Sequence, residues 1–145
     1  MNMRDAIISI QGLQRDPAGQ TDRIELVTQG EYGFEDGNIR FTYPESDLTG
    51  MEGTFTTFTV SPLGVVMSRE GNMTSQMVFQ PGRKHYFLYE TPFGSATMGV
   101  ETRRLVHSLG EHGGDIEIDY DIDIEHTPLG HNVFKINVKE NEYHD

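Results

Sequence analysis

This chain of 145 residues contains no cysteine and few basic residues. Without cysteine it cannot form a disulfide framework, a thiolate zinc site or a thiol nucleophile, and its composition suits a reducing compartment. Its 11 Lys and Arg are outnumbered by 23 Asp and Glu, which gives a formal net charge of −12. Such a surface repels the backbone of nucleic acids and anionic membranes. We therefore expect no nucleic-acid partner and no membrane partner.

Long apolar runs and known catalytic motifs are also missing. No stretch is long enough to span a membrane, and the N-terminus lacks a basic segment followed by an apolar run, so we expect a cytoplasmic protein. No Gly-x-Ser-x-Gly motif, phosphate-binding loop or dinucleotide fingerprint occurs. Two histidine pairs, His107 with His112 and His126 with His131, are each five residues apart, which matches no zinc signature. The sequence predicts no cofactor and no metal site.

The clearest pattern that is present is an alternation of acidic and apolar residues from 115 to 125. Acids occupy every odd position, and the even positions hold Ile116, Ile118, Tyr120, Ile122 and Ile124. A period of two places the two sets on opposite faces of a β-strand. We predict that the apolar set is buried and that the acids face solvent.

Turn residues divide the rest of the chain into segments that alternate in the same way. Asp36-Gly37 and Pro81-Gly82 are typical of tight turns. Ten strands are expected, at about residues 6–12, 24–32, 39–43, 55–60, 65–69, 73–79, 83–91, 95–107, 115–125 and 132–139. The segment 95–107 could instead hold a short helix, but a strand fits better. In a hairpin with the acidic strand it would place Val100 near Ile122, Thr102 near Tyr120 and Arg103 beside Asp119.

Consecutive antiparallel strands with short connections predict an all-β fold. We expect a single domain, residues 1–145, formed by one antiparallel meander that closes into a barrel of about 8–10 strands. A two-sheet sandwich is the alternative.

A set of short motifs supports the barrel: Arg69-Glu70-Gly71, Met77-Val78-Phe79, Gly82, Tyr89-Glu90-Thr91-Pro92-Phe93-Gly94 and Thr102. Their order and spacing resemble the YwiB-like family of uncharacterised bacterial proteins, a domain of unknown function. The resemblance covers nearly the whole chain. It implies a lipocalin-like (calycin-type) β-barrel with no established activity.

The candidate site consists of polar residues that occupy the same alternate positions of a strand as inward-facing apolar residues, that is, the same parity. Arg69 shares its parity with Val65 and Met67, and Arg104 shares its parity with Val100 and Thr102. A guanidinium inside a barrel needs an anion or several carbonyl groups, because an unpaired buried charge costs several kcal/mol. A β-bulge that shifts the parity, or a side chain that reaches the barrel mouth, are the alternatives. The predicted ligand-binding residues are Arg69, Tyr86, Tyr89, Thr102 and Arg104.

Three classes of function stay open. The preferred one is an intracellular barrel that binds a small, partly apolar ligand, anionic if the arginines bind it. A cofactor-free enzyme would need His85 to face the interior as a general acid or base. An interaction module would use the acidic strand against a basic protein, since residues 111–145 contain ten acids and only two lysines, a net charge of −8. Sequence does not decide whether the chain is an enzyme, nor its oligomeric state.

Overall fold

The regular structure of the described residues is β-strand throughout. The computed structural model describes residues 1–46, 52–71, 74–91 and 94–141, with only the backbone described at 90 and 91. These ranges contain no helix long and apolar enough to cross a membrane. The ten strands are β1 (Arg4–Arg15), β2 (Thr21–Glu35), β3 (Asn38–Pro44), β4 (Thr54–Ser61), β5 (Gly64–Gly71), β6 (Ser75–Phe79), β7 (Lys84–Thr91), β8 (Gly94–His107), β9 (Gly113–Ile124) and β10 (Thr127–Glu140). The predicted all-β fold is confirmed.

The strands form one antiparallel sheet that curls into a nearly closed barrel. Their order is β6-β5-β4-β3-β2-β1-β10-β9-β8-β7. Strands consecutive in sequence are therefore paired, except that β6 does not pair with β7. The first and last strands pair with each other, with Ile8 opposite Val138 and Ile10 opposite Ile136. The unpaired edges of β6 and β7 lie against each other. The predicted meander therefore closes through its two ends, and its seam lies in the middle of the chain.

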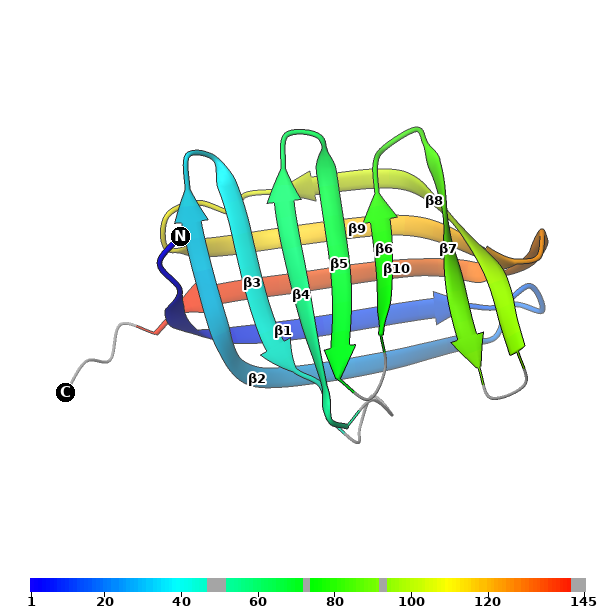
Figure 1. Ribbon diagram of the computed structural model, residues 1–145, viewed down its shortest axis with the longest axis horizontal. Helices are drawn as coiled ribbons and strands as arrows, with labels where there is room; N and C mark the ends of the chain where they lie inside the picture. Colours follow the sequence, from blue (N-terminus) through cyan, green and yellow to red (C-terminus); the bar gives the residue numbers. More distant parts are fainter. Residues whose placement is uncertain (47–51, 72–73, 92–93, 142–145) are drawn as a thin grey trace.

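The barrel is flattened into two layers of strands (Figure 1). The long strands β2, β1, β10, β9 and β8 run side by side in one layer, and β3 to β7 cross them steeply in the other. β2 belongs to both layers, because its first part pairs with β1 and its last part, from Glu31 to Glu35, pairs with β3. Gly30 directly precedes the part of β2 that pairs with β3, and a Cβ atom there would overlap the carbonyl oxygen of Thr42. Glycine therefore permits the close approach of backbones at this corner.

The core lies between the two layers and is filled by the inward parity of each strand. In β9, Ile116 is 1 % exposed and Ile118 is 0 % exposed, whereas the acids Asp115 to Asp123 lie on the outer face, Asp115 fully and the others partly exposed. The predicted burial is confirmed for Ile116, Ile118 and Tyr120, whereas Ile122 and Ile124 are only partly buried. Large aromatic side chains fill the centre, with the rings of Phe41 and Phe58 stacked 4.9 Å apart.

A β-bulge in β8 overturns the prediction made for Arg104. Val100 lies opposite Ile122 and Thr102 opposite Tyr120, as predicted, but the register then shifts so that Arg104 lies opposite Asp119. The extra residue in the bulge, Arg103, reverses the alternation, and both arginines are exposed while Leu105 turns inward to the core. The predicted inward orientation of Arg104 is therefore wrong. The predicted pairing of Arg103 with Asp119 is wrong as well, since its Nε donates to Asp121 at 2.6 Å.

The last strand starts earlier than its alternation suggested. Glu125 and His126 form a two-residue turn in which both have positive φ, 47° and 68°, and β10 begins at Thr127 rather than near Asn132. Hairpin turns with two positive φ angles usually contain Asn or Gly. The sequence Glu-His therefore carried no signal for this turn, and the hairpin was missed.

Candidate ligand-binding chamber

Two adjoining cavities occupy one end of the barrel interior. Their volumes are about 350 Å³ and about 200 Å³. They adjoin each other, and we call the two together the end chamber. Five residues line both cavities: Gln14, Arg69, Tyr120, Asn132 and Phe134. The chamber opens to solvent beside Gln14, Asp22 and Ile24, all of which are exposed. It is large enough to admit a small organic molecule.

One half of the end chamber is apolar. Its lining comprises Met67, Met77, Met98, Ile122, Ile124, Leu129 and Tyr89, besides the shared residues. Met77 lies on β6 and Tyr89 on β7, so this half lies beneath the seam, where the two edge strands are not hydrogen-bonded to each other. Three methionines give the wall flexible, polarisable side chains that can adjust to the shape of an occupant.

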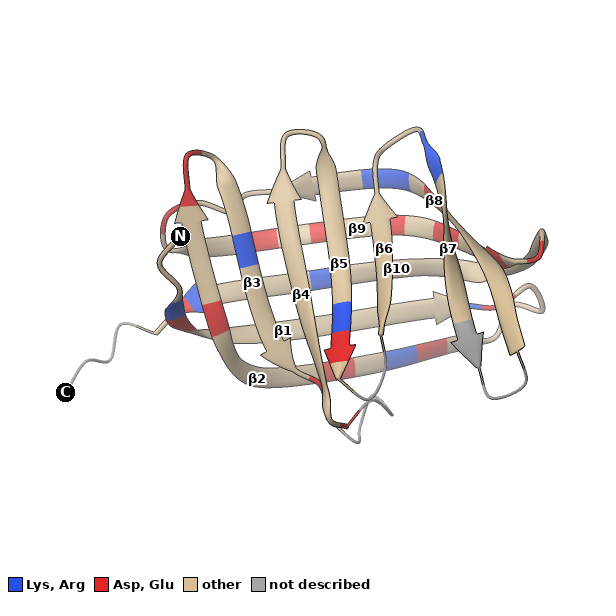
Figure 2. Cartoon of the chain, viewed as in Figure 1, with Lys and Arg blue, Asp and Glu red and all other residues tan. Residues whose placement is uncertain are grey.

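The other half holds two buried donors that find no acceptor. The Nε of Arg69 and the Nδ2 of Asn132 are both inaccessible to solvent, and neither has a hydrogen-bond partner among the described residues. Arg69 is the only Lys or Arg of β5, near the strand's end (Figure 2). Leaving a buried donor unsatisfied costs about 1–3 kcal/mol, and more for a charged group. Both residues line the chamber, so a shift of either side chain would bring its unsatisfied donor to whatever fills the space.

The acceptors of this half, by contrast, are used within the protein. Glu45 is 8 % exposed and accepts a hydrogen bond from the Oγ1 of Thr56 at 2.6 Å. Burial, the charge of Glu45 and a hydrogen bond to Glu45 raise the pKa of Tyr43 far above its usual value, and the opposing charge of Arg69 does not offset them. Burial likewise raises the pKa of Tyr120. Both phenols stay protonated and neutral at physiological pH. The charged groups of this half are therefore Arg69 and Glu45, together with the exposed Asp22 at the mouth.

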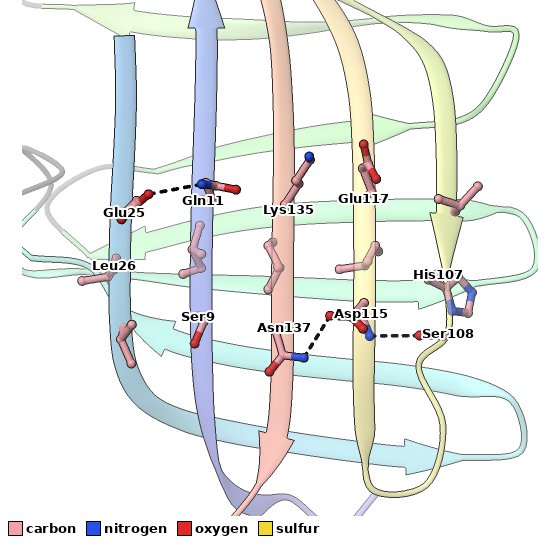
Figure 3. A pocket seen from close by; sticks show the side chains of 15 residues that line it. Ser9, Gln11, Glu25, Leu26, His107, Ser108, Asp115, Glu117, Lys135 and Asn137 are labelled. Atoms are coloured by element: carbon pink, nitrogen blue, oxygen red, sulfur yellow. Dashed lines mark hydrogen bonds between the residues drawn. The ribbon is translucent and has the colours of Figure 1, made fainter.

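A larger concavity, which we call the outer groove, lies on the outside of the long-strand layer (Figure 3). Its volume is about 690 Å³, and it runs across β2, β1, β10, β9 and β8. Its polar groups are paired with one another: Gln11 donates to Glu25 at 3.2 Å, and Asn137 donates to Asp115 at 2.9 Å. Its lining contains three acids, Glu25, Asp115 and Glu117, and one lysine, Lys135. The groove is an open, mainly acidic surface rather than an enclosed pocket.

Two histidines contact acids on the outer surface. His131 contacts Asp119 through Nε2 and Asp121 through Nδ1, both at 2.8 Å, and His112 contacts Glu140 at 2.6 Å. Within the described ranges, no group of three or more His, Asp or Glu side chains is arranged to hold a metal ion.

Comparison with known proteins identifies the family. The family described as "Domain of unknown function (DUF1934)" matches residues 8–136. The chain belongs to this family. The crystal structure of ywiB protein from Bacillus subtilis is similar to it, with a TM-score of 0.83 at 21 % identity over 96 % of this chain and 93 % of that one, a likeness that shows the fold. None of the curated proteins matches the sequence.

The DUF1934 family is described as a domain of unknown function and so assigns no role to any residue. The structure places the predicted site residues as follows. Arg69 and Tyr89 line the end chamber, and the predicted inward orientation of Arg69 is confirmed. Thr102 is 1 % exposed and its Oγ1 has no partner in the described structure, but it lies outside the chamber lining. Arg104 is exposed, for the reason given above.

Tyr86 lies on the outer face of β7 and is 54 % exposed. Its ring is in edge contact with His126, and the Nζ of Lys84 lies 5.5 Å from its centroid. The inward parity of β7 belongs to His85, Phe87 and Tyr89, so the prediction that Tyr86 faces the interior is wrong. His85 contacts Gln80 at 3.0 Å and is not among the described residues of the chamber wall.

Sequence reasoning missed Asn132, Gln14 and Glu45. Asn132 shares the parity of Phe134 and Ile136, apolar residues of the predicted last strand, so the alternation did indicate that Asn132 faces inward. Gln14 likewise shares the parity of Ile8 and Ile10. Glu45 follows the end of β3, where no periodicity indicates which side chains turn inward.

Proposed function

We propose that this protein is a lipocalin-like barrel that binds one small, partly apolar molecule in the end chamber, inside the cell. The supporting observation is the chamber itself: space within an otherwise filled barrel, walled by methionines and aromatics and containing two unsatisfied donors. An occupant that covers the apolar wall would remove that surface from water, and one that accepts hydrogen bonds from Arg69 and Asn132 would satisfy their donors.

The size of the chamber limits the occupant. Since a water molecule takes about 30 Å³ in the liquid, 350 Å³ corresponds to roughly a dozen water-sized groups. The adjoining 200 Å³ adds room for a polar head. The ligand is therefore a metabolite-sized molecule rather than a polymer.

Native mass spectrometry of the freshly purified protein tests the proposal, together with titration of the apolar dye 1-anilinonaphthalene-8-sulfonate. The expected result is a retained small molecule, or saturable binding of one dye molecule per chain. Gly12→Leu is the matched blocked variant, because Gly12 lines the chamber and a Cβ there would have only the Phe134 ring within 3.9 Å. A folded Gly12→Leu protein should lose the binding. Wild-type protein that retains nothing and binds no dye would refute the proposal.

A second candidate, docking of a basic protein, is favoured by the outer groove. Its three carboxylates and single lysine complement a cationic segment, and the 70 % exposed Val27 at its edge offers an apolar contact. Binding at such an exposed charged surface weakens as ionic strength rises, whereas binding in the end chamber should not. Titration with a lysine-rich peptide at about 0.05 M and about 0.5 M salt separates the two sites.

A catalytic function receives no support from His85. The general acid or base of a cofactor-free enzyme has to reach the bound molecule. His85 is hydrogen-bonded to Gln80 and is not among the residues described as lining the end chamber. The chamber is accordingly proposed as a binding site alone.

A further inference from the structure

The geometry points to a monocarboxylate with an apolar tail as the ligand of the end chamber, with its carboxylate on Arg69 and Asn132 and its tail against Met67, Met77 and Met98. This inference rests on the proposed binding function and specifies the chemistry of the ligand. It follows from which polar groups in the chamber are already satisfied and which are not.

The unsatisfied groups are donors. The Nε of Arg69 and the Nδ2 of Asn132 need acceptors, whereas the Glu45 carboxylate already accepts from Thr56 and Tyr43. An occupant that only donates hydrogen bonds, such as an alkylammonium ion, would leave both buried donors unpaired. The chamber therefore selects for acceptor oxygens, and the guanidinium selects for a planar anion that it can bind through parallel hydrogen bonds.

The two donors lie on opposite layers of the barrel and both border Tyr120. Arg69, on β5, lies opposite Thr56 of β4, and its charge acts on the Tyr43 and Tyr120 hydroxyl groups. Asn132, on β10, lies directly opposite Tyr120 of β9. A head group at the Tyr120 end of the chamber can thus meet a donor from each layer.

The charge of the head group is limited by Glu45. Its carboxylate lines the same half of the chamber as Arg69, and Asp22 adds a second, exposed carboxylate at the mouth, so this half has no net positive charge before any ligand binds. A single negative charge can be accommodated beside the guanidinium, but a dianionic phosphate would bring a second charge close to Glu45 at a further electrostatic cost. This favours a carboxylate over a phosphate monoester.

The tail direction follows from the other half of the chamber. Beyond the five shared residues, that half presents apolar or aromatic side chains only. An aliphatic or aromatic tail there removes apolar surface from water, at about 25 cal/mol per Å² buried. The tail would lie beneath the seam between β6 and β7.

Calorimetric titration with four probes of equal chain length tests the inference: octanoate, 1-octanol, octylamine and octyl phosphate. Octanoate should bind roughly tenfold to a hundredfold more tightly than each of the others, the range expected for hydrogen bonds to a charged group. Arg69→Met and Asn132→Leu should each remove that advantage while leaving octanol binding intact. Arg104→Met is the matched control, because Arg104 is exposed and outside the chamber wall, and it should behave as wild type.

Two kinds of failure are distinguishable. If octanol or octylamine binds as tightly as octanoate, or octyl phosphate binds more tightly, the chamber is a binding site but the carboxylate inference is wrong. If no probe binds and the dye also fails to bind, the proposed function itself is wrong. The probe comparison in wild-type protein gives a decision even if the Arg69 variant does not fold.

Discussion

At the residue scale, alternation separated the two faces of each regular strand but did not always show which face is inward. Tyr86 and Tyr89 lie on opposite faces of β7, yet both were predicted to bind the ligand. Val65, Met67 and Arg69 occupy one parity of β5 without interruption, and Arg69 faces the interior as expected. What alternation could not show is whether a buried polar atom finds a partner there. That depends on residues from other strands and from loops, such as Glu45, whose positions only the folded chain fixes.

The contact of His112 and Arg4 with Glu140 gives a prediction at this scale. Arg4 donates to the carboxylate at 2.8 Å and His112 contacts it at 2.6 Å. The hydrogen bond to Glu140 raises the pKa of His112 above 6.5, and the hydrogen bonds from His112 and Arg4 lower the pKa of Glu140 below 4.5. The His112 contribution to stability is complete below pH 6.5 and is lost as the pH rises through the raised value. The Glu140 contribution is complete above pH 4.5 and is lost as the pH falls through the lowered value.

We therefore expect His112→Gln to lower the urea midpoint of unfolding most between about pH 4.5 and 6.5, with a smaller difference at pH 8. NMR titration of the His112 ring should show its pKa falling toward the ordinary value in Glu140→Gln. A midpoint difference that grows from pH 6 to pH 8, or a His112 pKa unchanged in Glu140→Gln, would contradict the contact.

At the element scale, the ten strands were predictable because each is a run of alternating residues bounded by turn formers. The errors come from features that add or remove one residue from the pattern. The bulge at Arg103 inverts the parity of the end of β8, and nothing in the local sequence distinguishes a bulged Thr-Arg-Arg from a regular one. The corner in β2 is similar, because its glycine also fits an ordinary strand.

That corner is tested by substituting Gly30 and Gly12, two glycines inside long strands. A methyl group at Gly30 would overlap the Thr42 carbonyl oxygen and lie 2.6 Å from the Cδ1 of Ile8, so Gly30→Ala should destabilise the fold by about 1–3 kcal/mol. A methyl group at Gly12 would meet nothing closer than the Phe134 ring at 3.8 Å, so Gly12→Ala should be close to neutral. Urea unfolding of both variants is the measurement, and equal effects would show that the corner does not require glycine.

At the scale of the whole molecule, the closed meander was predictable from the number of strands, but the position of its seam was not. A meander written in sequence order suggests free edges at the first and last strands. Instead β1 and β10 pair over ten positions, from Ala6–Glu140 to Arg15–His131, and β6 and β7 are left as the two edges. This outcome depends on strand tilt and curvature, which are properties of the assembled sheet.

The seam predicts how the molecule opens. β1 and β10 are hydrogen-bonded on both sides, whereas β6 pairs only with β5 and β7 only with β8. Detaching β6 or β7 breaks one ladder, while detaching β1 or β10 breaks two. Amides of β6 and β7 should therefore exchange hydrogen by local opening, and those of β1 and β10 only by global unfolding. Native-state hydrogen exchange followed strand by strand is the measurement, and equal protection of all four strands would contradict this order.

The end chamber is lined by Met77 of β6 and Tyr89 of β7, so an occupant such as octanoate should slow hydrogen exchange on both sides of the seam. In β1, exchange should slow only as far as the ligand raises the free energy of global unfolding.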